Sequence, residues 1–126
     1  MTKYLNLPAE MRKIYYLSTC STCKRIMSEL PLDDFQKQDI KTDPMTEEQL
    51  NEMGQLAGSF ESLFSRVAMK YKALGLKDML LTESDYKRHI LKEYTFLKRP
   101  IFIIDSEIFI GNSKKNVEAV RLKLTQ

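Results

Sequence analysis

Two cysteines stand three positions apart near the start of the chain, in the run Ser18-Thr19-Cys20-Ser21-Thr22-Cys23. They follow the apolar run 14–17 and precede a segment, 23–30, whose apolar residues recur at helical spacing. The order strand, loop, helix places a thiol at the first turn of a helix, where unpaired backbone N–H groups and the helix dipole favour thiolate over thiol. Because only the thiolate attacks a disulfide or an electrophile, the pattern indicates redox chemistry.

Two other uses of this cysteine pair compete with redox chemistry. A structural zinc site needs four ligands, and the only further nitrogen or sulfur ligand of the usual kind is His89, so carboxylates or a second subunit would have to complete it. The thiols can also be buried and inert, as free cysteines often are. Cys23 partly fits this second description because it lies on the apolar stripe of the helix. Cys20 is flanked by serine and threonine, so we interpret it as reactive and expect no metal site.

Composition and charge place the chain among ordinary globular proteins. Its 126 residues, 43% hydrophobic and 29% charged, fit one domain with a single core. The net charge of +3 comes from 20 cationic residues interspersed with 17 anionic ones, which does not indicate binding to nucleic acid or membranes. No apolar run approaches the roughly 20 residues of a membrane span, and the first residues lack the apolar centre of a signal peptide. We therefore expect a cytoplasmic protein, in a compartment that keeps dithiols reduced.

The apolar pattern predicts strands that alternate with helices. Strands are expected at 14–17, 35–40, 101–104 and 108–110, the last two forming a hairpin. Helices are expected over 23–30, from the capping box at Thr46 to Gly58, over 60–74, from Thr82, and after Ser113. This order predicts a mixed four-stranded sheet covered by helices. Residues 1–12 are expected to form an N-terminal extension, and residues 13–126 a single domain with a helical insertion at about 59–95.

Three segments together resemble the ArsC/Spx family of thioredoxin-fold proteins. They are the run 18–25 around the cysteines, the run Asp43-Pro44-Met45-Thr46-Glu47-Glu48-Gln49-Leu50, and Leu97-Lys98-Arg99-Pro100-Ile101. They occur in the family's order, and the similarity extends from Lys13 to the C-terminus. The resemblance implies an α/β, thioredoxin-like, mixed four-stranded sheet with a helical insertion before the strand that begins with a cis-proline.

The resemblance also implies roles for individual residues. Cys20 corresponds to the nucleophilic cysteine, Cys23 to the resolving cysteine of Spx-like members, and Pro100 to the cis-proline beside the active cysteine. Arg99 corresponds to the anion-binding arginine, whose fork of donors suits an oxyanion or a glutathione carboxylate. Further substrate-binding candidates are Ser21, Thr22, Lys24 and Arg66. We expect no tightly bound cofactor, and glutathione, a glutaredoxin or a thioredoxin as the reductant.

The arginine pattern separates this chain from true arsenate reductases, which gather several arginines around the oxyanion. Only Arg99 is matched cleanly, and Glu61 stands where a second arginine would align. We therefore predict a thiol–disulfide oxidoreductase that acts on a small thiol or oxyanion substrate, or on a redox protein partner, rather than an arsenate reductase. The alternative is an Spx-like redox-sensing regulator that binds the alpha subunit of RNA polymerase, since Gly58 and Arg66 resemble Spx positions. A third reading is an interaction module without redox chemistry.

Overall fold

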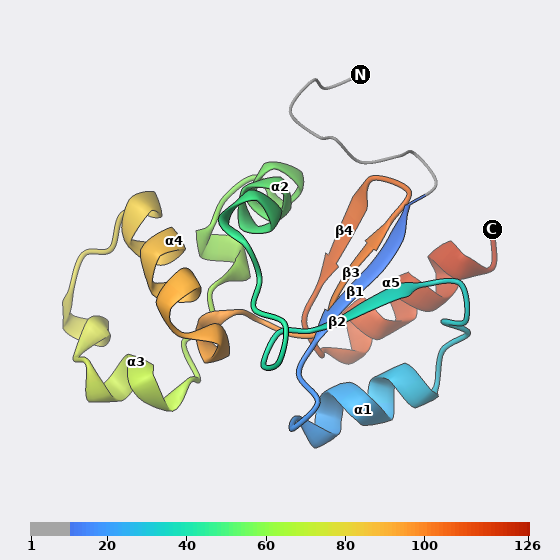
Figure 1. Cartoon of the computed structure of the whole chain (residues 1–126), viewed down its shortest axis with the longest axis horizontal. Coiled ribbons are helices and arrows are strands. Elements are labelled where there is room, and N and C mark those ends of the chain that lie inside the picture. The colour runs from blue at the N-terminus through green and yellow to red at the C-terminus, as the bar shows by residue number, and fades with distance from the viewer. Residues whose placement is uncertain (1–10) are drawn as a thin grey trace. The chain divides into compact units, whose positions relative to one another are not determined.

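The computed structural model of the protein describes residues 11–126 (Figure 1). These residues form two compact units, one that contains the described residues up to Pro44 together with Arg99–Gln126, and one that is Met45–Lys98. The predicted N-terminal extension, residues 1–12, falls outside the described residues except for Met11 and Arg12, and Arg12 belongs to the first strand. The predicted insertion at about 59–95 lies within the second unit, which begins earlier, at Met45.

The first unit contains a mixed four-stranded sheet, as the sequence predicts. Its strands are β1 (Arg12–Tyr16), β2 (Gln36–Asp39), β3 (Ile101–Ile104) and β4 (Glu107–Ile110), in the order β2-β1-β3-β4. β1 pairs in parallel with β2 and antiparallel with β3, and β3 pairs antiparallel with β4. All four residues of β3 are buried, which is typical of an apolar run in the interior of a sheet.

A two-residue turn joins β3 to β4. Asp105 and Ser106 have φ angles of 50° and 73°, the left-handed conformation that a type I′ hairpin turn requires at both central positions. The turn confirms the hairpin predicted around these residues.

Two helices, α1 (Ser21–Ser28) and α5 (Lys114–Leu124), cover the same face of this sheet (Figure 1). Ile26 of α1 and Val120 of α5 are buried in one cluster with Ile14 of β1 and Phe102 of β3. Since burial of each such side chain contributes about 1.5–3 kcal/mol, this cluster holds α1 in a fixed place against the sheet. The position of the first turn of α1 is therefore set by the core of the unit.

The second unit consists of helices and turns. Its elements are α2 (Glu47–Ala57), η1 (Glu61–Leu63), α3 (Met69–Ala73), η2 (Leu76–Asp78), α4 (Glu83–Lys92) and η3 (Tyr94–Phe96). The predicted capping box is present: the Gln49 backbone N–H donates to Thr46 Oγ1, and the Thr46 N–H donates to Gln49 Oε1, both at 3.0 Å. Gly58 ends α2 with a φ of 89°, as predicted. In the described part of the chain, no helix has the length and apolar character needed to cross a bilayer.

The single helix predicted over residues 60–74 is wrong. Phe64 has an extended backbone and forms a bridge with Leu97, and the Ser65 N–H donates to the Phe96 carbonyl at 2.6 Å. These pairings use backbone groups that a continuous helix would need internally. The chain forms η1, an extended stretch and α3 instead, and Val67, expected on the buried stripe, is 93% exposed.

Candidate active site

Cys20 lies at the junction of β1 and α1, as the sequence predicts. A turn follows β1, closed by a 3.0 Å hydrogen bond from the Cys20 N–H to the Leu17 carbonyl. Cys20 then serves as the N-cap of α1, with the extended φ and ψ angles of −95° and 108° that this position requires. Its Sγ atom accepts a hydrogen bond from the Cys23 N–H at 3.5 Å. Cys20 is half-buried, so the residue keeps part of its surface in contact with solvent.

The surroundings of Cys20 favour its thiolate. Partial burial, the largest single influence, opposes ionisation and raises the pKa of the thiol. Hydrogen bonds from the backbone and thiol of Cys23, the charge of Arg99 and the N–H of Thr22 act in the opposite direction, and together they lower the pKa below its ordinary value. A lowered thiol pKa increases the fraction of nucleophile at neutral pH.

Cys23 has the opposite environment, although it lies one turn further along the same helix. Its side chain is fully buried, and burial raises the pKa of the Cys23 thiol to about 12, against hydrogen bonding from the Leu17 backbone. The hydrogen bond to Cys20 and the charge of Cys20 raise it further, whereas the charge of Arg99 lowers it. Both cysteines are reduced in this structure. The pair thus consists of one activated sulfur and one thiol that stays protonated.

Arg99 and Pro100 precede β3 and lie in the same unit as the cysteines. The Arg99–Pro100 peptide bond is cis, as the resemblance implies. The buried Pro100 accepts a hydrogen bond through its carbonyl from the Gly111 N–H at 2.9 Å, which fixes this segment against the end of β4. Arg99 is half-buried, and its charge acts on both thiols. The structure therefore brings Cys20, Cys23 and Arg99 together.

The remaining substrate-binding candidates differ in burial and in their relation to Cys20. Ser21 is exposed at the start of α1, and Thr22 is half-buried with its N–H directed at Cys20. Lys24 is exposed and is not among the groups that shift the pKa of Cys20. Arg66 belongs to the second unit, where its guanidinium contacts Glu61 Oε2 and the Tyr86 hydroxyl, both at 3.0 Å. A role for Arg66 in binding substrate therefore stays a prediction.

Asp39 is a residue near this site that our sequence analysis did not select. It is the last residue of β2, and its carboxylate accepts a hydrogen bond from the Ser18 N–H, two residues before Cys20, at 3.2 Å. Its position at the carboxyl end of a strand parallel to β1 was the available signal, because polar residues at that edge face the loops where sites form. Hydrogen bonds from the Ser18 side chain, and from the backbone of Ser18 and Lys41, hold the pKa of Asp39 below its ordinary value, although burial opposes them.

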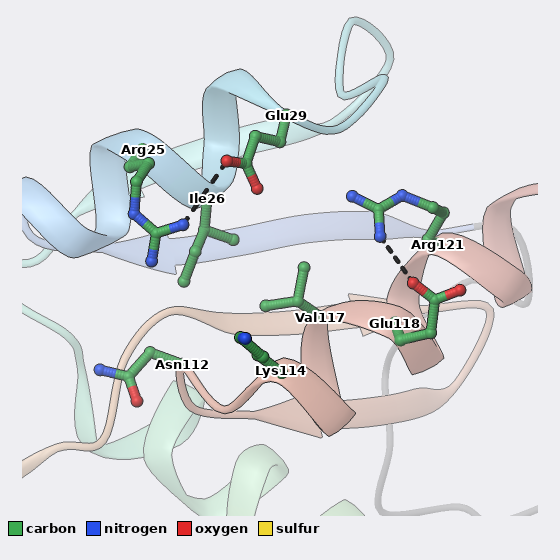
Figure 2. A pocket seen from close by; sticks show the side chains of 8 residues that line it. All are labelled: Arg25, Ile26, Glu29, Asn112, Lys114, Val117, Glu118 and Arg121. Carbon is green, nitrogen blue, oxygen red and sulfur yellow. Dashed lines mark hydrogen bonds and ion pairs between the residues drawn. The ribbon is translucent and has the colours of Figure 1, made fainter.

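A hollow of about 300 Å³ lies between α1 and α5 (Figure 2). Its floor is Ile26 and Val117, which are 1% and 8% exposed and offer little surface to a ligand. Four charged side chains of its rim pair within their own helices, as Arg25–Glu29 and Arg121–Glu118. None of Cys20, Cys23 and Arg99 lines it. The hollow is therefore a gap between side chains beside the site and not part of it. Among residues 11–126, no three histidine, cysteine, aspartate or glutamate side chains gather as metal ligands.

The charge of Arg99 gives a testable pH dependence. In Arg99→Met, loss of this charge is expected to raise the pKa of Cys20, because the guanidinium favours the thiolate. The alkylation rate of Cys20 at pH 7 should fall about three- to tenfold, while the rate well above the pKa should stay unchanged. The measurement is the iodoacetamide reaction rate from pH 5 to 10. Lys98→Met removes an equal charge from the exposed neighbouring residue and should leave the profile in place. A profile for Arg99→Met that overlays the wild type would contradict the assignment.

Comparison with protein families gives a match to the model of the ArsC family over residues 15–120. No match was found among curated proteins.

Solved structures give further matches, several of them described as arsenate reductases or as ArsC-related proteins. An arsenate reductase from Vibrio cholerae is 18% identical, with a TM-score of 0.71, covering 92% of this chain and 98% of its own. An arsenate reductase (ArsC) related protein from Brucella melitensis is 20% identical, with a TM-score of 0.66 and coverages of 90% and 96%. A protein from Streptococcus mutans described as a possible arsenate reductase is 26% identical, with a TM-score of 0.69 and coverages of 88% and 98%. These matches extend over almost the whole length of each chain, and they confirm the predicted thioredoxin-like fold.

Proposed function

This chain belongs to the ArsC family, and from that premise we propose that it is a thiol–disulfide oxidoreductase in which Cys20 attacks and Cys23 resolves. The single observation that supports the proposal is that the two thiols have opposite environments, with Cys20 half-buried at the N-cap of α1 and Cys23 fully buried one turn later. The pKa of Cys20 is lowered and that of Cys23 is raised to about 12. Cys20 can therefore attack as a thiolate, whereas Cys23 stays protonated until the second step.

The first step is attack of the Cys20 thiolate on a sulfur of the substrate disulfide. A bond forms between Cys20 Sγ and that sulfur, the substrate S–S bond breaks, and the leaving thiolate takes a proton from solvent. The product is a mixed disulfide on Cys20 and one free thiol. Arg99 and the N–H groups of Thr22 and Cys23 stabilise the attacking thiolate before the step.

The second step is attack of Cys23 on the mixed disulfide. Burial, the largest cause of the raised pKa of Cys23, persists, but once Cys20 is bonded to substrate it carries no negative charge to raise that pKa further. Cys23 then releases its proton more readily, attacks Cys20 Sγ, and expels the second substrate thiol. The substrate gains two electrons and two protons, and the protein is left with a Cys20–Cys23 disulfide. Two glutathione molecules, or the dithiol of a glutaredoxin or thioredoxin, restore the reduced pair.

Arsenate is a poorer candidate for the substrate than a disulfide. An oxyanion requires several cationic donors around it, and Arg99 is the arginine that acts on the thiols. The guanidinium of Arg66 is already paired with Glu61 at 3.0 Å, so that carboxylate would compete with an oxyanion for it. A small disulfide or a glutathione mixed disulfide needs no such cluster. A dithiol cycle of this kind also suits the reducing conditions of the cytoplasm.

The test is to compare turnover on two substrates with glutathione as the reductant. We expect reduction of a small glutathione mixed disulfide well above the uncatalysed rate, and no arsenate reduction above background. Arsenate reduction without disulfide reduction would overturn the proposal. Turnover on neither substrate, together with capture of the alpha subunit of RNA polymerase, would instead support an Spx-like regulator.

A further inference from the structure

We propose that Asp39 is a positioning residue for Cys20, which holds the turn before the nucleophile through the backbone of Ser18. The inference rests on the proposed function, because it assigns Asp39 a part in keeping Cys20 reactive. Nothing in the family match or the site residues selected from the sequence assigns this carboxylate a role.

The sheet brings Asp39 beside the exit of β1. β1 and β2 run parallel, and Tyr16, the last residue of β1, is the register partner of Asp39, the last residue of β2. The Ile40 N–H donates to the Tyr16 carbonyl at 2.9 Å, so the pairing continues to the very end of both strands. The backbone therefore leaves β1 and β2 side by side, and the side chain of Asp39 at the end of β2 reaches the loop that follows β1.

The turn before Cys20 leaves one backbone donor for Asp39. The hydrogen bond from the Cys20 N–H to the Leu17 carbonyl closes the turn and does not use the Ser18 N–H, which lies at its second position. That N–H donates to Asp39 Oδ1 at 3.2 Å. The same oxygen accepts from the Lys41 N–H at 3.2 Å, and Oδ2 accepts from Thr42 Oγ1 at 3.4 Å. One carboxylate thus ties the loop before Cys20 to the loop after β2.

This tie matters because the reactivity of Cys20 depends on where its sulfur lies. Cys20 Sγ accepts a hydrogen bond from the Cys23 N–H at 3.5 Å, and a displacement of the turn away from α1 would lengthen and weaken it. Hydrogen bonds to an ionised acceptor are stronger than those between neutral groups, and an aspartate such as Asp39 is ionised at neutral pH. A charged acceptor therefore fixes the residue two positions before the nucleophile.

Geometry and charge predict opposite results for Asp39→Ala, which makes the test decisive. If Asp39 acted only through its negative charge, its removal would favour the Cys20 thiolate and speed alkylation at pH 7. If it positions the turn, removal loosens Cys20 from its donors, moves the pH profile upward and slows alkylation, by up to about tenfold. Asp39→Asn removes the charge but keeps an oxygen for the Ser18 N–H, although as a weaker acceptor, so it should be labelled faster than Asp39→Ala. The rate of Cys20 labelling by iodoacetamide, followed by peptide mass spectrometry from pH 5 to 10, measures all three.

Two further variants complete the design. Asp33→Ala removes a charge from an exposed residue of the same unit and should leave the profile unchanged. Asp39→Glu keeps the charge but shifts the carboxylate by one methylene, so it should also slow labelling, and it replaces Asp39→Ala if that variant does not fold. Unchanged or faster labelling in Asp39→Ala or Asp39→Glu, or an Asp39→Asn as slow as Asp39→Ala, would overturn the positioning role. An ordinary thiol profile in the wild type itself would instead remove the proposed function.

Discussion

Replacement of Cys20 by serine is expected to abolish disulfide reduction, with a loss of at least about 10³-fold in rate. The chemistry requires a thiolate, and a serine hydroxyl neither ionises near neutral pH nor attacks sulfur effectively. The fold should survive the change, because Cys20 is the N-cap of α1 and serine is among the best residues at that position. We therefore expect Cys20→Ser to unfold at a temperature no lower than the wild type while its activity disappears.

The measurement combines the initial rate of disulfide reduction with thermal unfolding followed by circular dichroism. Thr19→Ser is the matched control, since it alters an exposed side chain of the same loop and leaves both sulfurs in place. Activity that persists in Cys20→Ser would show that another group carries the reaction. Lost activity with a large drop in unfolding temperature would show that Cys20 serves structure instead.

The asymmetry of the two thiols follows from their positions on one short helix. Cys20 precedes the first turn, where its sulfur meets backbone donors and solvent, whereas Cys23 points into the unit and is fully buried. Desolvation is the largest influence on both pKa values, but only at Cys20 do the hydrogen bonds and the charge of Arg99 outweigh it. The three-residue spacing, together with the charge of Arg99, therefore gives the two sulfurs different reactivity.

Features encoded in a few consecutive residues were predictable from the sequence. The capping box at Thr46, the left-handed helix end at Gly58 and the turn at Asp105 each depend on local side chains and backbone angles, so the structure confirms them. The helix predicted over 60–74 failed because the backbone of Phe64 and Ser65 pairs with residues 96–97. The spacing of apolar residues within one segment carries no information about backbone pairing with residues about thirty positions away.

Contacts between distant parts of the chain were the harder part of the site. No spacing rule links Arg99 to Cys20. The prediction that both belong to one site came from the resemblance to a family and not from the residue pattern. Asp39 was missed for the same reason, because its role depends on the parallel register that places it opposite Tyr16. Sequence reasoning found the reactive sulfur, whereas the side chains that tune and hold it required the fold.

Replacement of Cys23 by serine is expected to separate the two chemical steps. Attack by Cys20 should continue within a few-fold of the wild-type rate, because Arg99 and the backbone N–H groups that lower its pKa remain. Resolution should slow by at least about 10²-fold, since an adjacent thiol has an effective concentration far above that of millimolar external thiol. The mixed disulfide on Cys20 should therefore accumulate.

The experiment mixes each reduced protein with oxidised glutathione and follows the intact mass with time. Wild-type protein should pass through a glutathione adduct to a form that lacks two hydrogens, in which peptide mapping finds the Cys20–Cys23 bond. Cys23→Ser should stop at one stable adduct, and Cys20→Ser should form none, because Cys23 is fully buried and burial, the largest cause of its raised pKa, remains in that variant. If Cys23→Ser turns over as fast as the wild type, an external thiol resolves the intermediate and Cys23 has no part in the cycle. That result would contradict the proposal that Cys23 stays buried and protonated until it attacks the mixed disulfide on Cys20.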